Sequence, residues 1–229
     1  MQTTLNEINK SKIELIDELN TEVNNCKKCE LWKTRNKPLV GDGHIYSKIL
    51  FIGESPGYNE DKEGRAFVGK AGKILDQLLE LVNLKRNEIY ITNVLKCHPP
   101  NNHNPNREEI NSCMGYLDRQ IEMIEPKAII TLGKFASREI FTKFNLEFTN
   151  ISQVRGKIFD AETSFGRIKI IPLYHPAVAC YNSEMFAVLK EDFVKLRDKI
   201  NNGIWNDYST LCQESTDGSN WLKNTWFYN

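Results

Sequence analysis

The segment KILFIGESPGYNEDKEGRAFVGKAGKILDQLL (48–79) decides the fold. It begins with a short apolar run, passes through a turn rich in glycine and proline, and ends in a stretch whose apolar residues recur at helical spacing. We therefore expect a buried strand over 48–53, a sharp turn from Gly53 to Gly57, and a helix over 70–84. Strand, loop and helix in this order are typical of a parallel α/β sheet.

The alternation of strand and helix continues along the chain. Further strands are expected at EIYITNV (88–94) and AIITLG (128–133). We expect either a β-hairpin, or an added strand beside a final core strand, from RGKIFD (155–160) and RIKIIPLYH (167–175). Helices are expected at 4–25, 107–125, 134–144 and 185–200. Short strands with intervening helices predict an α/β fold with a parallel sheet covered by helices on both faces.

Composition limits the kinds of partner. The 30 basic residues balance the 30 acidic ones, so a surface for nucleic acid must be a local patch. The N-terminal sequence MQTTLNEINKSKIELIDELN lacks the apolar core of a secretion signal, and no apolar stretch is long enough to cross a bilayer. We expect a protein of the cytoplasm or nucleoid with no membrane contact.

The chain divides into one domain and a tail. Residues 1–200 predict a single α/β domain with an N-terminal helix and a four-cysteine site. Residues 201–229 form a C-terminal extension of unknown role, too aromatic for a plain disordered tail. Its aromatic residues include Trp205, Trp221, Trp226 and Phe227.

Four of the six cysteines form a candidate metal centre. Cys26 and Cys29 make a C-x-x-C pair, Cys97 follows the strand at 88–94, and Cys113 lies in the second turn of the next helix. Intracellular thiols are kept reduced, which favours metal or redox chemistry over disulfides. Four thiolates suit zinc or an iron–sulfur cluster, and spacing does not distinguish them.

Unusual residues gather where the predicted strands end, which is where α/β sheets hold their chemistry. GESPGYNED follows the first strand, NVLKCHPPNNHNP the second, and HPAVACYN the last. Phe67 offers an exposed ring for stacking a base, and the helix amides at 69–72 suit a phosphate. A solvated acidic loop with a core Phe67 is the alternative interpretation.

Together, GESPGYNEDKEGRAFVGKAGKILDQLL, TNVLKCHPPNNHNP and YHPAVACYN closely resemble the three signature segments of the iron–sulfur type (family 4) uracil-DNA glycosylases, over about residues 20–200. The resemblance implies a three-layer α/β/α sandwich with a central four-stranded parallel sheet. It implies a 4Fe-4S cluster on the four cysteines, with zinc as the alternative. The implied function is base excision repair, in which uracil is flipped out of DNA and its N-glycosidic bond is hydrolysed to leave an abasic site.

The same resemblance implies individual roles. Phe67 would stack on the flipped uracil, and Asn93 would accept from N3–H while donating to O4, a pattern that cytosine reverses. His175 would donate to O2 as negative charge develops on the departing base. Glu60 would crowd the C5 edge and exclude thymine, and Glu54 would orient or activate the attacking water. All five residues lie in the three quoted segments.

Further residues are expected around these. Gly53 and Ser55 complete the base-binding loop, and Tyr181 would enter the duplex beside the extruded base. Lys70 and Arg155 are expected at DNA phosphates. Other cations available for phosphates are Arg65, Lys73, Lys96, Arg107 and Lys157.

Four positions depart from the family pattern. Ser55 stands where Ala or Gly is usual, Ala66 where Pro is common, His98 where Arg usually follows the third cysteine, and Cys180 where Leu is frequent. None removes a predicted catalytic group. His98 changes one phosphate-facing or cluster-facing contact, and Cys180, like Cys212, is expected to bind no metal.

Two other functions stay open at this point. One is a related glycosylase with a different lesion or a covalent-trapping chemistry, although the loop after the strand at 88–94 is short for the extra basic insertion that such chemistry implies. The other is a non-catalytic nucleic-acid-binding module with a structural zinc. The expected partner is uracil-containing DNA. A replication clamp or another repair protein would bind through the termini. The protein is expected to be a monomer.

Overall fold

The computed structural model describes residues 10–200 of the 229. The C-terminal extension and the start of the predicted helix at 4–25 lie outside these residues. The strands are β1 (Asp42–Gly43), β2 (Ile49–Gly53), β3 (Tyr90–Asn93), β4 (Ala128–Leu132), β5 (Phe159–Thr163) and β6 (Gly166–Leu173). The helices are α1 (Lys12–Asn24), α2 (Tyr58–Glu63), α3 (Lys70–Leu81), α4 (Arg107–Ile124), α5 (Gly133–Lys143), α6 (Ile151–Val154), α7 (Val178–Tyr181) and α8 (Glu184–Lys199), with short 3₁₀ turns at Glu30–Lys33, Arg86–Glu88 and Pro100–Asn102.

The sheet has six strands in the order β1-β3-β2-β4-β6-β5. The four inner strands run parallel, as the sequence implied, while β1 pairs with β3 and β5 pairs with β6 in antiparallel fashion. The predicted strand count of four is therefore too low. β1 contains only Asp42 and Gly43, which carry no apolar period, and β5 is the first arm of the hairpin that the sequence left open.

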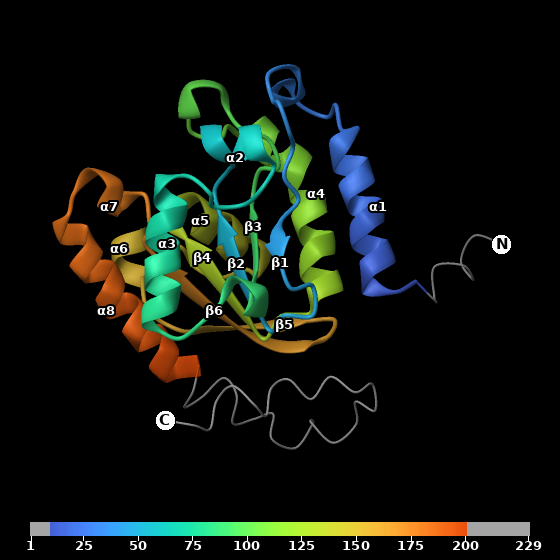
Figure 1. Ribbon diagram of the computed structural model, residues 1–229. Helices are drawn as coiled ribbons and strands as arrows, with labels where there is room; N and C mark the ends of the chain where they lie inside the picture. Colours follow the sequence, from blue (N-terminus) through green and yellow to red (C-terminus); the bar gives the residue numbers. More distant parts are fainter. Residues whose placement is uncertain (1–9, 201–229) are drawn as a thin grey trace.

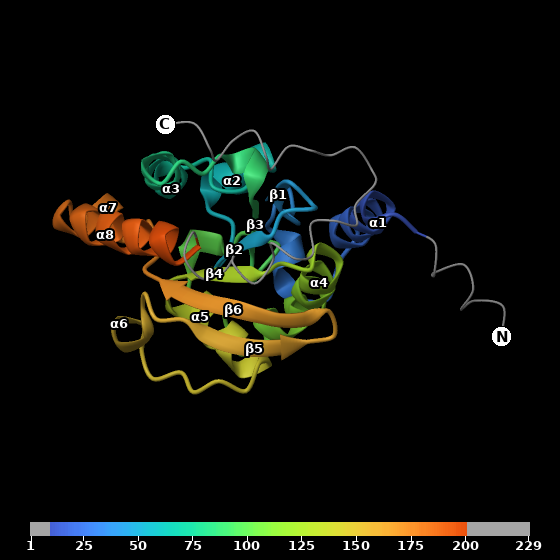
Figure 2. The same cartoon turned by 90° about the horizontal axis from the view of Figure 1, so that it is seen from below.

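Helices cover both faces of the sheet, which confirms the three-layer sandwich. Along β2, Ile49 and Phe51 belong to the core shared with α3 and α8, whereas Leu50 and Ile52 belong to the core shared with α4 and α5. Adjacent residues of a strand point to opposite faces, so a continuous apolar run marks a strand buried on both sides. Figure 2 shows α3 and α8 on one side of the sheet and α5 on the other.

Helix α1 lies along α4 at the edge of the domain (Figure 1). Ser11 caps its first turn, and Glu14 completes a capping box by accepting from the Ser11 backbone N–H. Leu19 and Val23 of α1 pack against Tyr116 of α4. This packing sets the C-x-x-C loop that follows α1 beside the first turns of α4. No helix within residues 10–200 has the length and apolar character that a bilayer span requires.

The parallel strands bring the predicted functional loops to one edge of the sheet. Gly53 at the end of β2 is in register with Asn93 at the end of β3. The loop with Glu54 leaves β2 at this edge, and His175 follows the end of β6 two strands away. Side chains far apart in the sequence thus surround one hollow.

Candidate active site

A pocket of about 550 Å³ opens at this edge of the sheet. That volume suits a small organic ligand such as a single nucleobase with part of its sugar. The pocket brings together eight residues predicted from the sequence, namely Glu54, Ser55, Glu60, Phe67, Lys70, Asn93, His175 and Tyr181. Cys180 lines it as well, and so do Tyr58 and Asn102, which the sequence analysis did not single out.

Asn93 supplies a buried acceptor at the base of the pocket. Its side chain is 2% exposed, and its Oδ1 has no hydrogen-bond partner among the described residues. Gly53 leaves room for it, because a Cβ on Gly53 would stand 2.3 Å from Asn93 Oδ1 and 2.9 Å from Phe67 Cζ. A buried polar atom without a partner is destabilising, which points to a ligand that donates a hydrogen to Asn93.

Phe67 forms a wall of the pocket in a strained conformation. Its φ of 54° lies in the left-handed region that non-glycine residues rarely adopt. The ring is 5% exposed, so the expectation of an exposed aromatic was wrong in degree, although the ring does line the pocket. It stacks on the His175 ring, with centroids 5.6 Å apart and planes 26° apart.

Arg86 holds the Phe67 segment in place. Its guanidinium donates to the carbonyl oxygens of Ala66 at 2.8 Å and Phe67 at 2.5 Å, and it is itself oriented by Asp76 at 2.5 Å. Helix α3 approaches from the other side, where a Cβ on Gly72 would stand 1.8 Å from the Phe67 oxygen. Sequence reasoning missed Arg86, since nothing in its local pattern separates it from an exposed arginine in a turn.

His175 is held as a neutral imidazole. The backbone N–H of Ala177 donates to its Nδ1 at 3.1 Å, so the proton of the neutral ring is assigned to Nε2. Burial lowers the pKa of His175 to about 4, against the opposing charge of Glu60. At neutral pH the pocket therefore holds an uncharged N–H donor.

The two carboxylates of the pocket differ in their surroundings. Glu60 accepts from the backbone N–H of Gly69 at 2.7 Å, so this one of the helix-start amides at 69–72 already has a carboxylate partner. Burial raises the pKa of the Glu54 carboxylate, and the charge of Lys134 opposes this effect. A carboxylate with a raised pKa at a pocket wall is suited to accept a proton.

The predicted DNA contacts divide into two groups. Tyr181 of α7 is 91% exposed at the pocket mouth, and Lys70 lines the same opening. Arg155 is not among the pocket-lining residues, and its Nη1 is 2.9 Å from the buried carboxylate of Asp192. Lys96 is only 1% exposed, so the expectation that it meets a phosphate was wrong.

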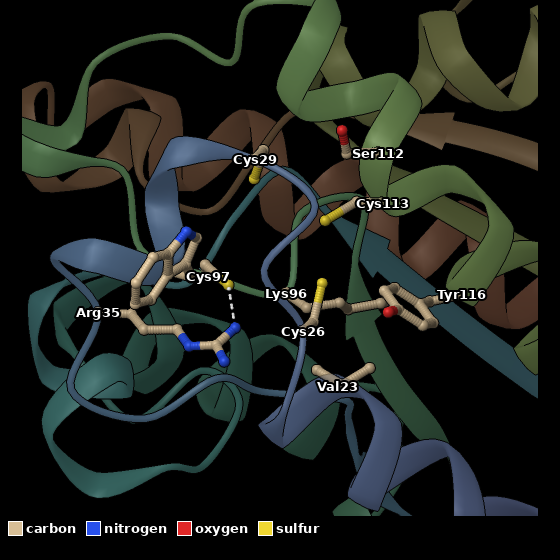
Figure 3. A pocket seen from close by; sticks show the side chains of 10 residues that line it. Val23, Cys26, Cys29, Arg35, Lys96, Cys97, Ser112, Cys113 and Tyr116 are labelled. Carbon is tan, nitrogen blue, oxygen red and sulfur yellow. Dashed lines mark hydrogen bonds between the residues drawn. The ribbon is translucent and has the colours of Figure 1, made fainter.

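The four predicted cysteines line one small cavity (Figure 3). Burial raises the pKa of the Cys29 and Cys97 thiols and raises that of Cys113 to about 11. Arg35 opposes this effect at Cys97, where its Nη1 donates to the sulfur at 3.0 Å. Within residues 10–200, no three His, Cys, Asp or Glu side chains converge on a point that could hold a single metal ion.

The C-x-x-C segment is also tied to the pocket wall. The buried carboxylate of Asp61 in α2 accepts from the Asn36 backbone N–H at 3.0 Å and from Asn36 Nδ2 at 2.5 Å. His98, next to Cys97, donates from Nδ1 to the Pro56 oxygen at 2.9 Å. The His98 contact therefore reaches the loop after β2, and no phosphate or cysteine contact is needed to explain it.

Comparison with known proteins gives consistent results. A family model described as the uracil DNA glycosylase superfamily matches residues 40–202. The type-4 uracil-DNA glycosylase of Sulfurisphaera tokodaii is 47% identical over 80% of this chain and 84% of its own length. Those of Archaeoglobus fulgidus and Saccharolobus solfataricus are 44% and 45% identical, over 80% and 81% of this chain and 92% and 86% of their own lengths.

The hydrogen bonds of Arg86 to the Phe67 segment predict that removing Arg86 lowers the free energy of unfolding more than removing an exposed arginine does. Arg86→Ala should lower the free energy of unfolding by about 2–4 kcal/mol, because two carbonyl oxygens lose a charged donor beside a strained residue. Arg119→Ala removes an exposed pair with Glu22 and should cost less than about 1 kcal/mol. Urea denaturation of both variants measures the difference. Equal losses of unfolding free energy would contradict the proposed role of Arg86 in holding Phe67.

Proposed function

The chain belongs to the uracil DNA glycosylase superfamily, and from this premise we infer that it excises uracil from DNA in base excision repair. It is a DNA N-glycosylase that hydrolyses the bond between uracil and deoxyribose. The observation that supports this chemistry most strongly is the buried, unpartnered Oδ1 of Asn93 beside the rings of Phe67 and His175. A planar base that carries a hydrogen donor would meet the needs of all three side chains.

Recognition of uracil is assigned to Asn93. Uracil N3–H would donate to Asn93 Oδ1, and the Asn93 amide N–H would donate to uracil O4. Cytosine presents an acceptor at N3 and a donor at its amino group, so it would leave the buried Oδ1 unpaired. Sites built around a buried polar group reject the ligand that fails to pair with it.

Departure of the base is assigned to His175. As the glycosidic bond breaks, electrons move onto the base and negative charge gathers at O2. The Nε2–H of a neutral His175 would donate to that oxygen and strengthen as the charge grows. The lowered pKa supports this assignment, because a protonated imidazole would be costly in so buried a position.

The attacking water is assigned to Glu54. The sugar carries positive charge as the bond breaks, and a carboxylate near it would stabilise this charge and accept a proton from water. Glu60 is the candidate for excluding thymine, since its contact with the Gly69 amide fixes its carboxylate at the pocket wall. Lys70 and Tyr181, which line the pocket, are assigned to DNA, and Tyr181 is the candidate to fill the gap left by the flipped base.

We propose that Cys26, Cys29, Cys97 and Cys113 hold a 4Fe-4S cluster. The donor set fits, because four thiols line one cavity, those of Cys29, Cys97 and Cys113 are buried, and Arg35 donates to one sulfur. Zinc is the alternative occupant of the same four thiolates. When bound, the cluster would supply a structural link between the N-terminal segment, the loop after β3 and α4.

Metal analysis separates the cluster from zinc. The purified protein should contain about four irons per chain with broad visible absorbance, since each thiolate of such a centre binds its own iron. Cys113→Ser should reduce the iron content sharply, whereas Cys180→Ser, a cysteine of the pocket, should leave it unchanged. About one zinc per chain, or equal iron loss in both variants, would contradict the proposed cluster.

The role of Glu54 predicts a specific pH profile. Turnover requires the ionised carboxylate, and burial raises the pKa of Glu54 above its usual 4.5, so kcat/KM should fall as the pH drops through this raised pKa. The pKa of His175 is lower, at about 4, so protonation of His175 does not cause this fall in kcat/KM at acidic pH. Glu54→Gln should reduce uracil release by about 10²–10⁴-fold and abolish the limb.

Single-turnover release of uracil from a labelled oligonucleotide measures both effects, with DNA affinity followed separately. Glu54→Gln should bind the oligonucleotide as well as the original protein does. A variant that keeps the original single-turnover rate would exclude Glu54 as the group that acts on water.

A further inference from the structure

Lys96 is a fully buried lysine that the proposed chemistry does not use. It follows β3 and precedes the cluster ligand Cys97, and its side chain is 1% exposed. Its Nζ lies 2.6 Å from the Asn93 backbone oxygen, 2.8 Å from Thr92 Oγ1 and 2.5 Å from Gln120 Oε1. A lysine is seldom buried this deeply without a defined partner.

Each of the three neighbours of Lys96 presents an oxygen that accepts from its Nζ. The Gln120 amide is oriented by its Nε2, which donates to the Val40 oxygen at 2.8 Å, so Oε1 faces the lysine. The Thr92 hydroxyl donates to the same Val40 oxygen at 2.5 Å and leaves a lone pair for Nζ. An ammonium can donate to all three oxygens at once, whereas a neutral amine has only two N–H groups to share among them.

The ammonium lacks a carboxylate partner among the described residues, as no ion pair of Lys96 is found there. Buried charges are normally paired with an opposite charge. Lys96 lines the cavity that the four cysteines surround (Figure 3). Burial lowers the pKa of Lys96 to about 7, and the charges of Cys113 and Cys97, which line the same cavity, oppose this effect.

We propose that Lys96 is a positioning residue that joins the two sites of the enzyme. Its charge balances the anionic cysteine centre on one side, and its N–H groups fix the Asn93 carbonyl on the other. This inference rests on the proposed function, since it assumes uracil at Asn93 and a cluster at the cysteines. It adds a physical reason for the cluster to lie next to a base pocket that it does not touch.

Two substitutions separate charge from hydrogen bonding. Lys96→Met removes both, whereas Lys96→Gln removes the charge and keeps an N–H donor for the Asn93 oxygen. Loss of a neighbouring positive charge should shift the reduction potential of the cluster to more negative values in both variants, because added electrons are then less stabilised. Uracil release, as kcat/KM, should fall by about 10–100-fold in Lys96→Met and by less in Lys96→Gln.

The experiment uses purified holoprotein and three readouts, namely iron content, cluster potential and the separate values of kcat and KM. Lys195→Met, in an exposed pair with Glu191, controls for loss of a lysine, and Leu117→Ala controls for loss of stability in the buried face of α4. Neither control should move the potential. If Lys96→Met does not fold, Lys96→Gln alone tests whether the charge of Lys96 affects the cluster potential.

An unchanged potential and unchanged kcat/KM in the Lys96 variants would overturn the inference. A shift no larger than that of Leu117→Ala would overturn it as well, since it would reflect stability alone. Original protein that releases no uracil or holds no iron would instead contradict the proposed function. A failure of the proposed function is distinguishable from a failure of this inference, because it appears in the original protein before any substitution is made.

Discussion

The parallel register of the four inner strands is the constraint on which the site depends. It places the ends of β2, β3 and β6 at one edge, so that loops separated by many residues meet around one hollow. The close approach of Gly53 and Asn93 in adjacent strands is its most demanding point, because any side chain on Gly53 would fill the space that Asn93 uses. Apolar packing on both faces of the sheet holds this register and so holds the pocket.

Burial then gives the pocket its chemistry. It leaves the Asn93 oxygen without a partner in the described structure, keeps His175 neutral, and raises the pKa of Glu54. The unpaired oxygen and the desolvated Glu54 carboxylate are unfavourable for the unliganded protein, and a bound base would benefit from both. The strained Phe67 backbone fits the same principle, since Arg86 and the packing of α3 maintain a conformation that the residue would not adopt alone.

Much of this arrangement could be predicted from the sequence, and the gaps have physical causes. The strands, helices and four cysteines are local patterns, and the base-pocket residues came from resemblance to a family. Phe67 was expected to be exposed and is buried, because exposure depends on the fold around a residue. Lys96 was taken for a phosphate contact, since nothing in the letters NVLKC tells that its side chain turns inward toward Gln120. Neither Arg86 nor β1 lies in a stretch whose apolar residues alternate or recur at a helical or strand spacing, so no sequence pattern singled them out.

We expect the buried Asn93 oxygen to be the group that selects uracil. The most direct measurement is single-turnover base release from matched oligonucleotides that carry uracil or cytosine, by the original protein and by Asn93→Leu, which keeps the branched shape and removes the amide. Uracil alone should be released, and Asn93→Leu should lose at least about 100-fold in rate. Equal rates for the two proteins, or equal release of uracil and cytosine by the original protein, would contradict it.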